Sequence, residues 1–488
     1  MMSTSAVVLT TLVAYKLVLI GIGLWARSRN RNEADFFLGG RGLGPWVAGL
    51  SYAASTSSAW VILGFSGFVY AIGLSALWMV PGIWAGYAVV WLYFGRRLRE
   101  ESIAHDQLTL TDFMLQDTAP RQRAPLAALA AALVIGCFVF YIAAQFDAAG
   151  KALAEHFALS LAEAVVLGAL IVAIYSMLGG YWAVSVTDTL QAVIMMLVAI
   201  GVPLAALAAA GGPAAVLSAL AEQMPPAYLQ VTGGHSALVF IGFVVGVVGM
   251  SLGTFGQPHL LSRLMAIRGE RERLRGFAIV IGWGVVVFLG MIALGLSGRA
   301  LMPDLANGET LFYRAATDYL PAVLAGVVVA ATLSAVMSTV DSILLAASGA
   351  VAHDLGVNRR FPERQLLISR TVTFAVAVLA VALTLSLPDT IFNRVLFAWS
   401  ALGAAFGPIV VWRVMGRLVP ARTALACMLA GFGTTVLFYA LGAAPETDSL
   451  LSQAAHLPGD PFERAVPWLP GLLVLLFWTG RNREEAGI

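Results

Sequence analysis

Charged residues are scarce in this chain of 488 residues, where Asp, Glu, Lys and Arg together make up 11% and hydrophobic residues 59%. A soluble domain of this length cannot bury so much apolar surface, so soluble enzymes and soluble binding modules are excluded. The net charge of +2 gives no reason to expect a nucleic-acid partner. The composition therefore predicts an integral membrane protein whose solvent is lipid.

Cysteine is almost absent, since the chain contains only Cys137 and Cys427, and both lie inside apolar runs. Two isolated thiols exclude a disulfide framework and a cysteine-based metal site. Lysine is equally rare, so arginine supplies 27 of the 29 basic residues. Arginine therefore carries almost all of the positive charge that decides membrane orientation.

Histidine is missing from the middle of every long apolar run. The GFSG sequence at 64–67 has the shape used by intramembrane serine proteases, but such enzymes need a histidine base on another helix. Asp188 and Asp341 lack the glycine-rich context of an aspartyl protease. We therefore predict no enzymatic activity, and we expect His259 and His353, at helix ends, to be ordinary hydrogen-bonded histidines.

Long apolar runs, by contrast, are abundant. Windows of about 20 apolar residues, the length that crosses about 30 Å of hydrocarbon, recur from one end of the chain to the other. They predict an all-α polytopic membrane protein with about 13 transmembrane helices. The expected spans are 5–26, 45–74, 76–95, 124–150, 159–179, 184–210, 236–257, 275–298, 319–350, 367–386, 390–412, 423–442 and 466–480. Nothing is left over for a soluble domain, so residues 1–488 are predicted to form one transmembrane domain.

Arginine is distributed unequally between the two sides of this predicted bundle. Of the 27 arginines, 23 fall in the connections on one side, and Arg263 is counted among them. The positive-inside rule places that side in the cytoplasm. We therefore predict a plasma (inner) membrane location, with the N-terminus outside and the C-terminus in the cytoplasm.

The second span carries an unusual polar run within SYAASTSSAWVILGFSG at 51–67. Four consecutive hydroxyl residues at 55–58 occupy every face of a helix at once, so they cannot all contact one neighbouring helix. Small polar residues often serve only close helix packing, and that alternative stays open. The pattern favours a helix that unwinds and turns its polar groups toward a cavity, as in secondary transporters.

A second interruption is expected in the seventh span, which ends in GVVGMSLGTFGQPH at 246–259. It lies five helices after the first, so the two units would have opposite topology in the membrane. This predicts a five-plus-five inverted repeat over about 45–210 and 236–417, with flanking helices at 5–26, 423–442 and 466–480. Glycine and proline are common in membrane helices, which is the simpler alternative.

The ninth span offers oxygen ligands on a single face. Ala335, Ser338 and Thr339 stand at i, i+3 and i+4, and with the carbonyls of Ala54 and Ser57 they would form an oxygen cage. Sodium prefers such oxygen-only ligands. Hydroxyls at this spacing also commonly bond back to their own helix.

Two aspartates within the spans are further functional candidates because charges are costly in the membrane. Asp188, with Asp341 and Ser342, could form a second cation or proton site, although Asp188 could instead cap a helix N-terminus. Asp147 and Lys151 stand at i, i+4 and are predicted to form a structural ion pair.

Several stretches carry a resemblance to a known family. They are FFLGGRGLGPWVAGLS at 36–51, SSAWVILGFSGFVYAIGLSALW at 57–78, LTLTDF at 108–113, GGYWAVSVTDTLQAVIM at 179–195, FGQPHLLSRLMAI at 255–267 and LSAVMSTVDSILLAASGAVAHDL at 333–355. In these stretches the chain resembles the sodium:solute symporter family, most closely its sodium/proline branch. The resemblance implies a LeuT-like core, the same five residues as sodium site, and a solute pocket near Ser58, Trp60, Tyr141 and Gln145.

The chain departs from the proline carriers of that family at three positions. It has Thr56 where they have an aspartate, and Met250 and Thr254 where they have aromatic residues. The residues expected to contact solute are Thr56, Ser58, Trp60, Tyr141, Gln145, Thr254 and Phe255.

Together these features predict a sodium-coupled symporter that imports a small organic solute by alternating access. The solute is an amino acid such as proline, or a related zwitterion or carboxylate. A proton-coupled symporter and a transporter-like solute sensor are the alternatives, although the C-terminal GRNREEAGI is too short for a signalling domain. The expected partners are the solute, the sodium ion and the lipid bilayer, with no nucleic acid and no obligatory protein partner.

Overall fold

The computed structural model describes residues 33–485 apart from 158, 177–179 and 388, together with short pieces at 10, 13–14, 17–22 and 25. The first predicted span, 5–26, therefore lies mostly outside the described residues. Over the described part the chain folds into helices and no strands, and only a single parallel bridge joins Leu43 to Ile267. The predicted all-α class is confirmed.

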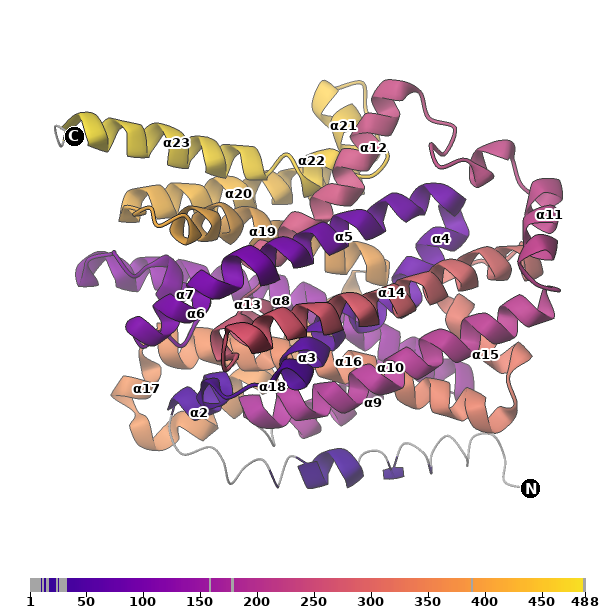
Figure 1. Cartoon of the computed structure of the whole chain (residues 1–488), viewed down its shortest axis with the longest axis horizontal. Helices are drawn as coiled ribbons and strands as arrows, with labels where there is room; N and C mark the ends of the chain where they lie inside the picture. The colour runs from indigo at the N-terminus through magenta and orange to yellow at the C-terminus, as the bar shows by residue number, and fades with distance from the viewer. Residues whose placement is uncertain are drawn as a thin grey trace.

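The described part of the chain contains twelve long or apolar helices, most of which run broadly side by side along the molecule (Figure 1). They are α3 (Pro45–Ala59), α5 (Met79–Ala88), α8 (Pro120–His156), α9 (Leu161–Ser176), α10 (Tyr181–Ala209), α12 (Ala237–Gly249), α14 (Glu270–Leu301), α16 (Ala322–Gly349), α18 (Gln365–Ser386), α19 (Ile391–Val414), α20 (Ala421–Ala443) and α23 (Trp468–Glu485). Shorter helices connect them: α2 (Glu33–Leu38), α4 (Ser66–Ile72), α6 (Gly95–Ala104), α7 (Leu110–Met114), α11 (Pro213–Gln223), α13 (Pro258–Ala266), α15 (Leu311–Tyr319), α17 (Val357–Arg360), α21 (Leu450–Ala455) and α22 (Pro461–Arg464).

Each predicted span from residue 45 onward coincides with a helical stretch. Within the described residues, nine stretches are long and apolar enough to cross a membrane, and one of them, Pro45–Ala104, runs through two predicted spans. Leu161–Ala173 and Trp468–Phe477 are apolar but shorter. The count of about 13 and the repeat boundaries remain predictions.

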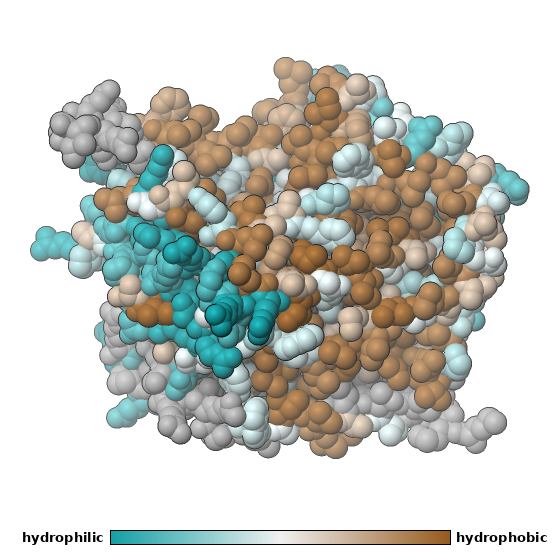
Figure 2. All heavy atoms as spheres, in the orientation of Figure 1, coloured by the Kyte–Doolittle hydropathy of each residue, from teal (hydrophilic) through white to brown (hydrophobic). Residues whose placement is uncertain are grey.

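The helices divide into an inner and an outer set. The apolar window of Ile391–Val414 is 94% buried inside the protein, whereas that of Leu367–Ser386 is only 22% buried. A helix that faces lipid needs apolar side chains just as a helix buried in protein does, so hydropathy does not distinguish the two sets. The buried fraction of each helix does. The surface is largely apolar, and hydrophilic side chains gather near the end of α6 and the start of α14 (Figure 2).

Both predicted interruptions are confirmed. Within α3 the backbone leaves the helical region at Ser58, with φ 39° and ψ −164°. Downstream, α12 ends at Gly249, a tight turn covers 250–256, Gln257 is extended, and α13 begins at Pro258. A β-carbon on Gly256 would lie 2.2 Å from the carbonyl oxygen of Leu402, so glycine is what lets α19 pack directly on this turn.

Candidate functional site

The break in α3 is held by side chains from two helices. Gln145 of α8 accepts a hydrogen bond from the amide of Ala59 at 3.2 Å and donates one to the Ser58 hydroxyl at 3.3 Å. The Trp60 indole donates to the carbonyl of Thr56 at 2.7 Å. Since a positive φ is unfavourable for serine, these bonds stabilise a strained backbone at the centre of the bundle. Three of the predicted solute residues, Ser58, Trp60 and Gln145, thus meet at one point.

Aromatic rings link the first break to the second. Trp60 packs on Trp399 of α19 with ring centroids 6.4 Å apart, and Trp399 lies against Gly253, whose added β-carbon would be 2.9 Å from that of Trp399. Tyr141 of α8 packs on His259 of α13 with ring centroids 6.1 Å apart. The interrupted parts of both helices therefore border one buried region.

Several buried polar atoms in this region have no partner within the described part of the chain, which makes it a candidate binding site. Among the described residues, the hydroxyl of Tyr141, the indole nitrogen of Trp399, both amide atoms of Gln257 and both ring nitrogens of His259 have no hydrogen-bond partner. All four side chains are at least 99% buried. Because unpaired buried polar groups are costly, such a cluster is suited to a polar ligand. The expectation of an ordinary, hydrogen-bonded His259 is therefore wrong.

The remaining predicted solute residues are placed differently. Thr56 donates to the carbonyl of Tyr52 at 2.9 Å, and Thr254 donates to that of Ser251 at 2.7 Å, so both hydroxyls are bound within their own segments. The ring of Phe255 packs on Phe94 and Trp468, neither of which was predicted to contact solute. A threonine hydroxyl in a helix has a nearby carbonyl available, which sequence spacing alone does not reveal.

The five predicted ion-site residues are all buried, and four of them come together across α3 and α16. The Ser338 hydroxyl lies 3.0 Å from the carbonyl oxygen of Ala335 and 3.5 Å from that of Ala54. The Thr339 hydroxyl lies 3.4 Å from the carbonyl oxygen of Ser55, which was not among the predicted ligands. Ser57 is also buried, but we find no bond from its side chain to this oxygen group in the described residues.

A buried ion pair stands beside these oxygens. Asp188 of α10 is 0% exposed, and its Oδ2 lies 3.0 Å from Nη2 of Arg263, which is 1% exposed. The same Oδ2 accepts hydrogen bonds from Ser51 at 2.7 Å and from Ser55 at 3.3 Å. Arg263 in turn donates to Ser342 at 2.5 Å, so one guanidinium joins α13 to α3, α10 and α16.

Two expectations are corrected by this ion pair. Arg263 is not one of the connection arginines, because it lies on α13 and is buried. Asp188 does not cap a helix, because α10 begins at Tyr181 and the N-cap residue is Gly180. The sequence did contain a sign that Arg263 is buried. The face of α13 that carries Leu260 and Leu264 is strongly apolar, and Arg263 adjoins that face. Asp341, the third residue of the predicted acidic site, is 3% exposed on α16.

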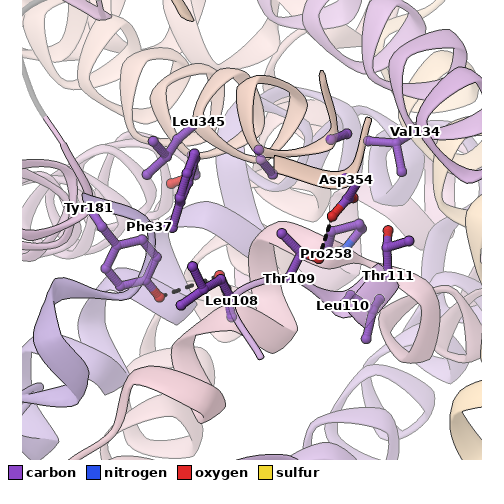
Figure 3. A pocket seen from close by; sticks show the side chains of 15 residues that line it. Phe37, Leu108, Thr109, Leu110, Thr111, Val134, Tyr181, Pro258, Leu345 and Asp354 are labelled. Atoms are coloured by element: carbon purple, nitrogen blue, oxygen red, sulfur yellow. Dashed lines mark hydrogen bonds between the residues drawn. The ribbon is translucent and has the colours of Figure 1, made fainter. Parts of the chain in front are cut away.

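A small cavity of about 40 Å³ is lined by Ser342 of α16 and by Asp354, which lies in the helical segment Ala350–Asp354 after α16. Figure 3 shows this cavity from close by. Phe37, Tyr181 and Asp354 point into it, and Asp354 accepts a hydrogen bond from Thr109 at 2.6 Å. The volume suits a few water molecules or an ion, and is too small for an organic solute.

The predicted structural ion pair is confirmed and is larger than expected. Lys151 lies 2.8 Å from Asp147 and also 2.8 Å from Glu309, in the turn before α15. The other oxygen of Glu309 accepts from the backbone amide of Phe392 at 3.0 Å, at the start of α19. Glu309 was missed because it lies in a polar connection whose sequence gives no hint of this contact.

Comparisons with known proteins agree with these features. A family model described as the sodium:solute symporter family matches residues 36–431. Sodium/proline symporters of Staphylococcus aureus strains JH9 and NCTC 8325 / PS 47 are each 32% identical to the chain over 442 residues, which is 88% of this chain and 85% of theirs.

Two solved structures resemble the fold. The substrate-bound outward-open state of a Na+-coupled sialic acid symporter gives a TM-score of 0.75 at 15% identity and covers 96% of both chains. A nucleobase-cation-symport-1 family transporter, in a closed conformation with bromovinylhydantoin bound, gives 0.57 at 12% identity, covering 91% of this chain and 95% of its own. The predicted LeuT-like fold class is confirmed.

Proposed function

The chain belongs to the sodium:solute symporter family, and we propose that it imports a small amino acid or a related zwitterion or carboxylate. Family membership confirms the predictions of a multi-pass membrane protein, of sodium as coupling ion, and of a transporter rather than an enzyme. The proposed membrane is the plasma (inner) membrane of the cell, with the N-terminus outside, and this orientation rests on the arginine distribution.

The coupling ion is proposed to bind between α3 and α16. Its ligands are the carbonyl oxygens of Ala54 and Ala335 and the hydroxyls of Ser338 and Thr339, with a further oxygen from Ser55 or Ser57. The observation that carries this assignment is the approach of Ser338 to within 3.5 Å of the Ala54 carbonyl at a broken helix. Neutral oxygens in a dry site are the ligands that a hard monovalent cation prefers.

The solute is proposed to bind beside the break, between Trp60, Tyr141 and the second interruption. The polar atoms available there belong to Tyr141, Gln257, His259 and Trp399, which are neutral donors and acceptors. Arg263 lies on the same helix as His259 and is buried, but its positive charge is already paired with Asp188. Such a set suits a compact molecule that carries its own compensating charges.

For the second acidic site we propose a changed role. Asp188 Oδ2 is occupied by Arg263, so a second sodium ion or a proton would have to share that oxygen with a guanidinium. The other oxygen, Oδ1, has no partner in the described residues and is the ligand left for such an ion. We therefore expect the guanidinium of Arg263 to take the place of a second sodium ion or proton beside Asp188. Asp341 and Ser342 would line the surroundings of this guanidinium.

Coupling follows from where the ion would bind. An ion between α3 and α16 holds the broken helix against its neighbour, and it can favour solute binding only if both ligands stabilise the same conformation. At a membrane potential near 100 mV, each charge that moves inward adds about 2.3 kcal/mol to the driving force.

The function is tested by uptake into proteoliposomes that contain the purified full-length protein. Radiolabelled L-proline, other small amino acids and short carboxylates are offered with an inward sodium gradient, a matched potassium gradient, or an inward proton gradient. We expect one class of solute to accumulate only with sodium. Accumulation that follows the proton gradient and ignores sodium would overturn the assignment.

Replacing Gln257 by leucine tests the solute site. Its amide makes no hydrogen bond within the described protein, so Gln257→Leu should leave the thermal unfolding temperature unchanged. Loss of a solute contact worth about 1.4 kcal/mol should raise the half-saturating solute concentration about tenfold. The matched control is Gln191→Leu in α10, because Gln191 is equally buried and equally unpaired. Equal effects of the two substitutions would contradict the proposed site.

A further inference from the structure

A basic surface lies where α6 meets the start of α14, and hydrophilic side chains gather there (Figure 2). Residues 95–104 and 268–275 carry seven arginines and four glutamates, so this α6–α14 surface has a net charge of +3. The two segments are bonded to each other, because Arg99 donates to the carbonyl of Arg268 at 2.7 Å and Arg273 donates to the carbonyl of Trp91. The surface contains none of the residues proposed to bind ion or solute.

Each glutamate of the α6–α14 surface is already paired with an arginine, in the pairs Glu100–Arg96, Glu101–Arg97, Glu270–Arg273 and Glu272–Arg268. A fifth arginine, Arg99, donates to two backbone carbonyls. The remaining two, Arg271 and Arg275, are exposed, and within the described residues neither forms an ion pair. They stand four residues apart on α14, so both side chains can reach one anion.

The two unpaired arginines begin a stripe of exposed residues along one side of α14. Helical spacing places the apolar residues that continue this stripe on the same side, and they are Leu274, Ala278, Gly282 and Leu289. Leu274 is 46% exposed and Leu289 is 57% exposed. The apolar window of α14 as a whole is only 39% buried, so this side of the helix is available to acyl chains. Charge at one end and apolar surface beyond it match the order of headgroup and chain in a phospholipid.

Exposed aromatic side chains lie at the same level of the molecule. Tyr93 is 59% exposed and Trp46 is 64% exposed. Both stand close to Gly276, which follows the second unpaired arginine, because a β-carbon on Gly276 would lie 2.6 Å from the ring of Trp91 and 3.5 Å from the carbonyl oxygen of Pro45. Exposed tyrosine and tryptophan gather at the boundary between membrane and water. The unpaired arginines therefore stand at the level where lipid headgroups lie.

We propose that Arg271 and Arg275 bind the headgroup phosphate of an anionic phospholipid whose acyl chain lies along the exposed side of α14. Guanidinium groups hold phosphate through paired, charge-assisted hydrogen bonds. A zwitterionic phospholipid also carries a phosphate, but its own amine offsets that charge, so the basic surface favours a lipid with net negative charge. A β-carbon on Gly49 of α3 would lie 2.9 Å from the carbonyl oxygen of Gly276, so the lipid would rest on a helix that packs directly against the broken one.

Native mass spectrometry of the full-length protein tests the proposal. The protein is purified in detergent and titrated with dioleoyl phosphatidylglycerol, which is anionic, or with dioleoyl phosphatidylcholine, which is zwitterionic. We expect phosphatidylglycerol to bind more tightly. Arg271→Gln together with Arg275→Gln should weaken the binding of phosphatidylglycerol about thirtyfold, which corresponds to about 2 kcal/mol for two arginines. The binding of phosphatidylcholine should not change.

A second double variant makes the result specific. Arg121→Gln together with Arg364→Gln also removes two exposed arginines, but from α8 and from the segment before α18, and should leave the binding of phosphatidylglycerol unchanged. Both double variants should keep the thermal unfolding temperature of the unaltered protein, because exposed side chains of this kind contribute little to stability. A loss of lipid binding is then not a loss of fold.

Equal binding of the two phospholipids, or an equal loss of phosphatidylglycerol in both double variants, would overturn the proposal. Displacement of phosphatidylglycerol by inorganic phosphate would identify a free anion as the ligand and would also overturn it. The assay contains no sodium gradient and no transported solute, so its result is independent of the proposed function.

Discussion

Replacing Arg263 by glutamine is expected to destabilise the protein by about 3–5 kcal/mol and to abolish sodium-driven uptake. The substitution leaves Asp188 fully buried with a negative charge and without its cationic partner. It also removes the donor that reaches Ser55 and Ser342 on two other helices. Thermal unfolding of the detergent-solubilised protein, followed by size-exclusion chromatography, measures the loss of stability.

A surface arginine on the connection after α13 provides the control. Arg268 is 64% exposed in its side chain and pairs with Glu272 at 3.5 Å, so Arg268→Gln should change stability by no more than about 1 kcal/mol. The double variant Asp188→Asn with Arg263→Gln removes both charges and should recover most of the stability that either single variant loses. Equal instability of the double and single variants would show that the charge pair is not what the guanidinium contributes.

Removing the hydroxyl of Ser338 or of Thr339 is expected to raise the sodium concentration for half-maximal uptake about tenfold, which corresponds to about 1.4 kcal/mol of ion binding. Each hydroxyl lies within 3.5 Å of a carbonyl oxygen of α3, so each is placed to bind an ion between the helices. Initial uptake rates in proteoliposomes, measured against sodium concentration, report the change for Ser338→Ala and Thr339→Ala.

Two variants make this test specific. Thr339→Ser keeps the hydroxyl and should retain most of the sodium affinity. Ser334→Ala removes an equally buried hydroxyl from the same helix, and among the described residues that hydroxyl bonds to Ala330 of its own helix alone, at 2.7 Å. If Ser334→Ala shifts the sodium dependence as far as Ser338→Ala does, the ion is not bound by this group of oxygens.

Much of the fold could be predicted from sequence because the bilayer imposes strong rules. Apolar length gives the spans, and four consecutive hydroxyl residues at 55–58 cannot all face one neighbour in an intact helix. Glycine and Pro258 mark the second break for the same reason, since both disfavour a continuous helix. Spacing along α16 likewise placed Ser338 and Thr339 on one face, and that face is the one that meets α3.

The details that failed depend on tertiary contacts between distant segments. In the sequence, Arg263 stands close to the arginines of a connection between two predicted spans. Only the packing of α13 against α3 and α10 reveals that its side chain is buried. Thr56 and Thr254 were assigned to solute by position, yet each finds a carbonyl in its own segment. The partners of Glu309 come from α8 and α19, more than 80 residues away in either direction along the chain.

The bonds between α3 and α16 have a consequence for the rate at which this protein works. Ser55 is tied to α16 twice, through its carbonyl to Thr339 and through its hydroxyl to Ser342 at 3.1 Å, and the hydroxyl also contacts Arg263. Any movement that separates the two helices must break both of the bonds from Ser55 to α16. Under the proposed function, release of the coupling ion requires the same separation of α3 and α16, so these bonds and the bonds from Arg263 to Ser55 and Ser342 would add to the barrier that limits turnover.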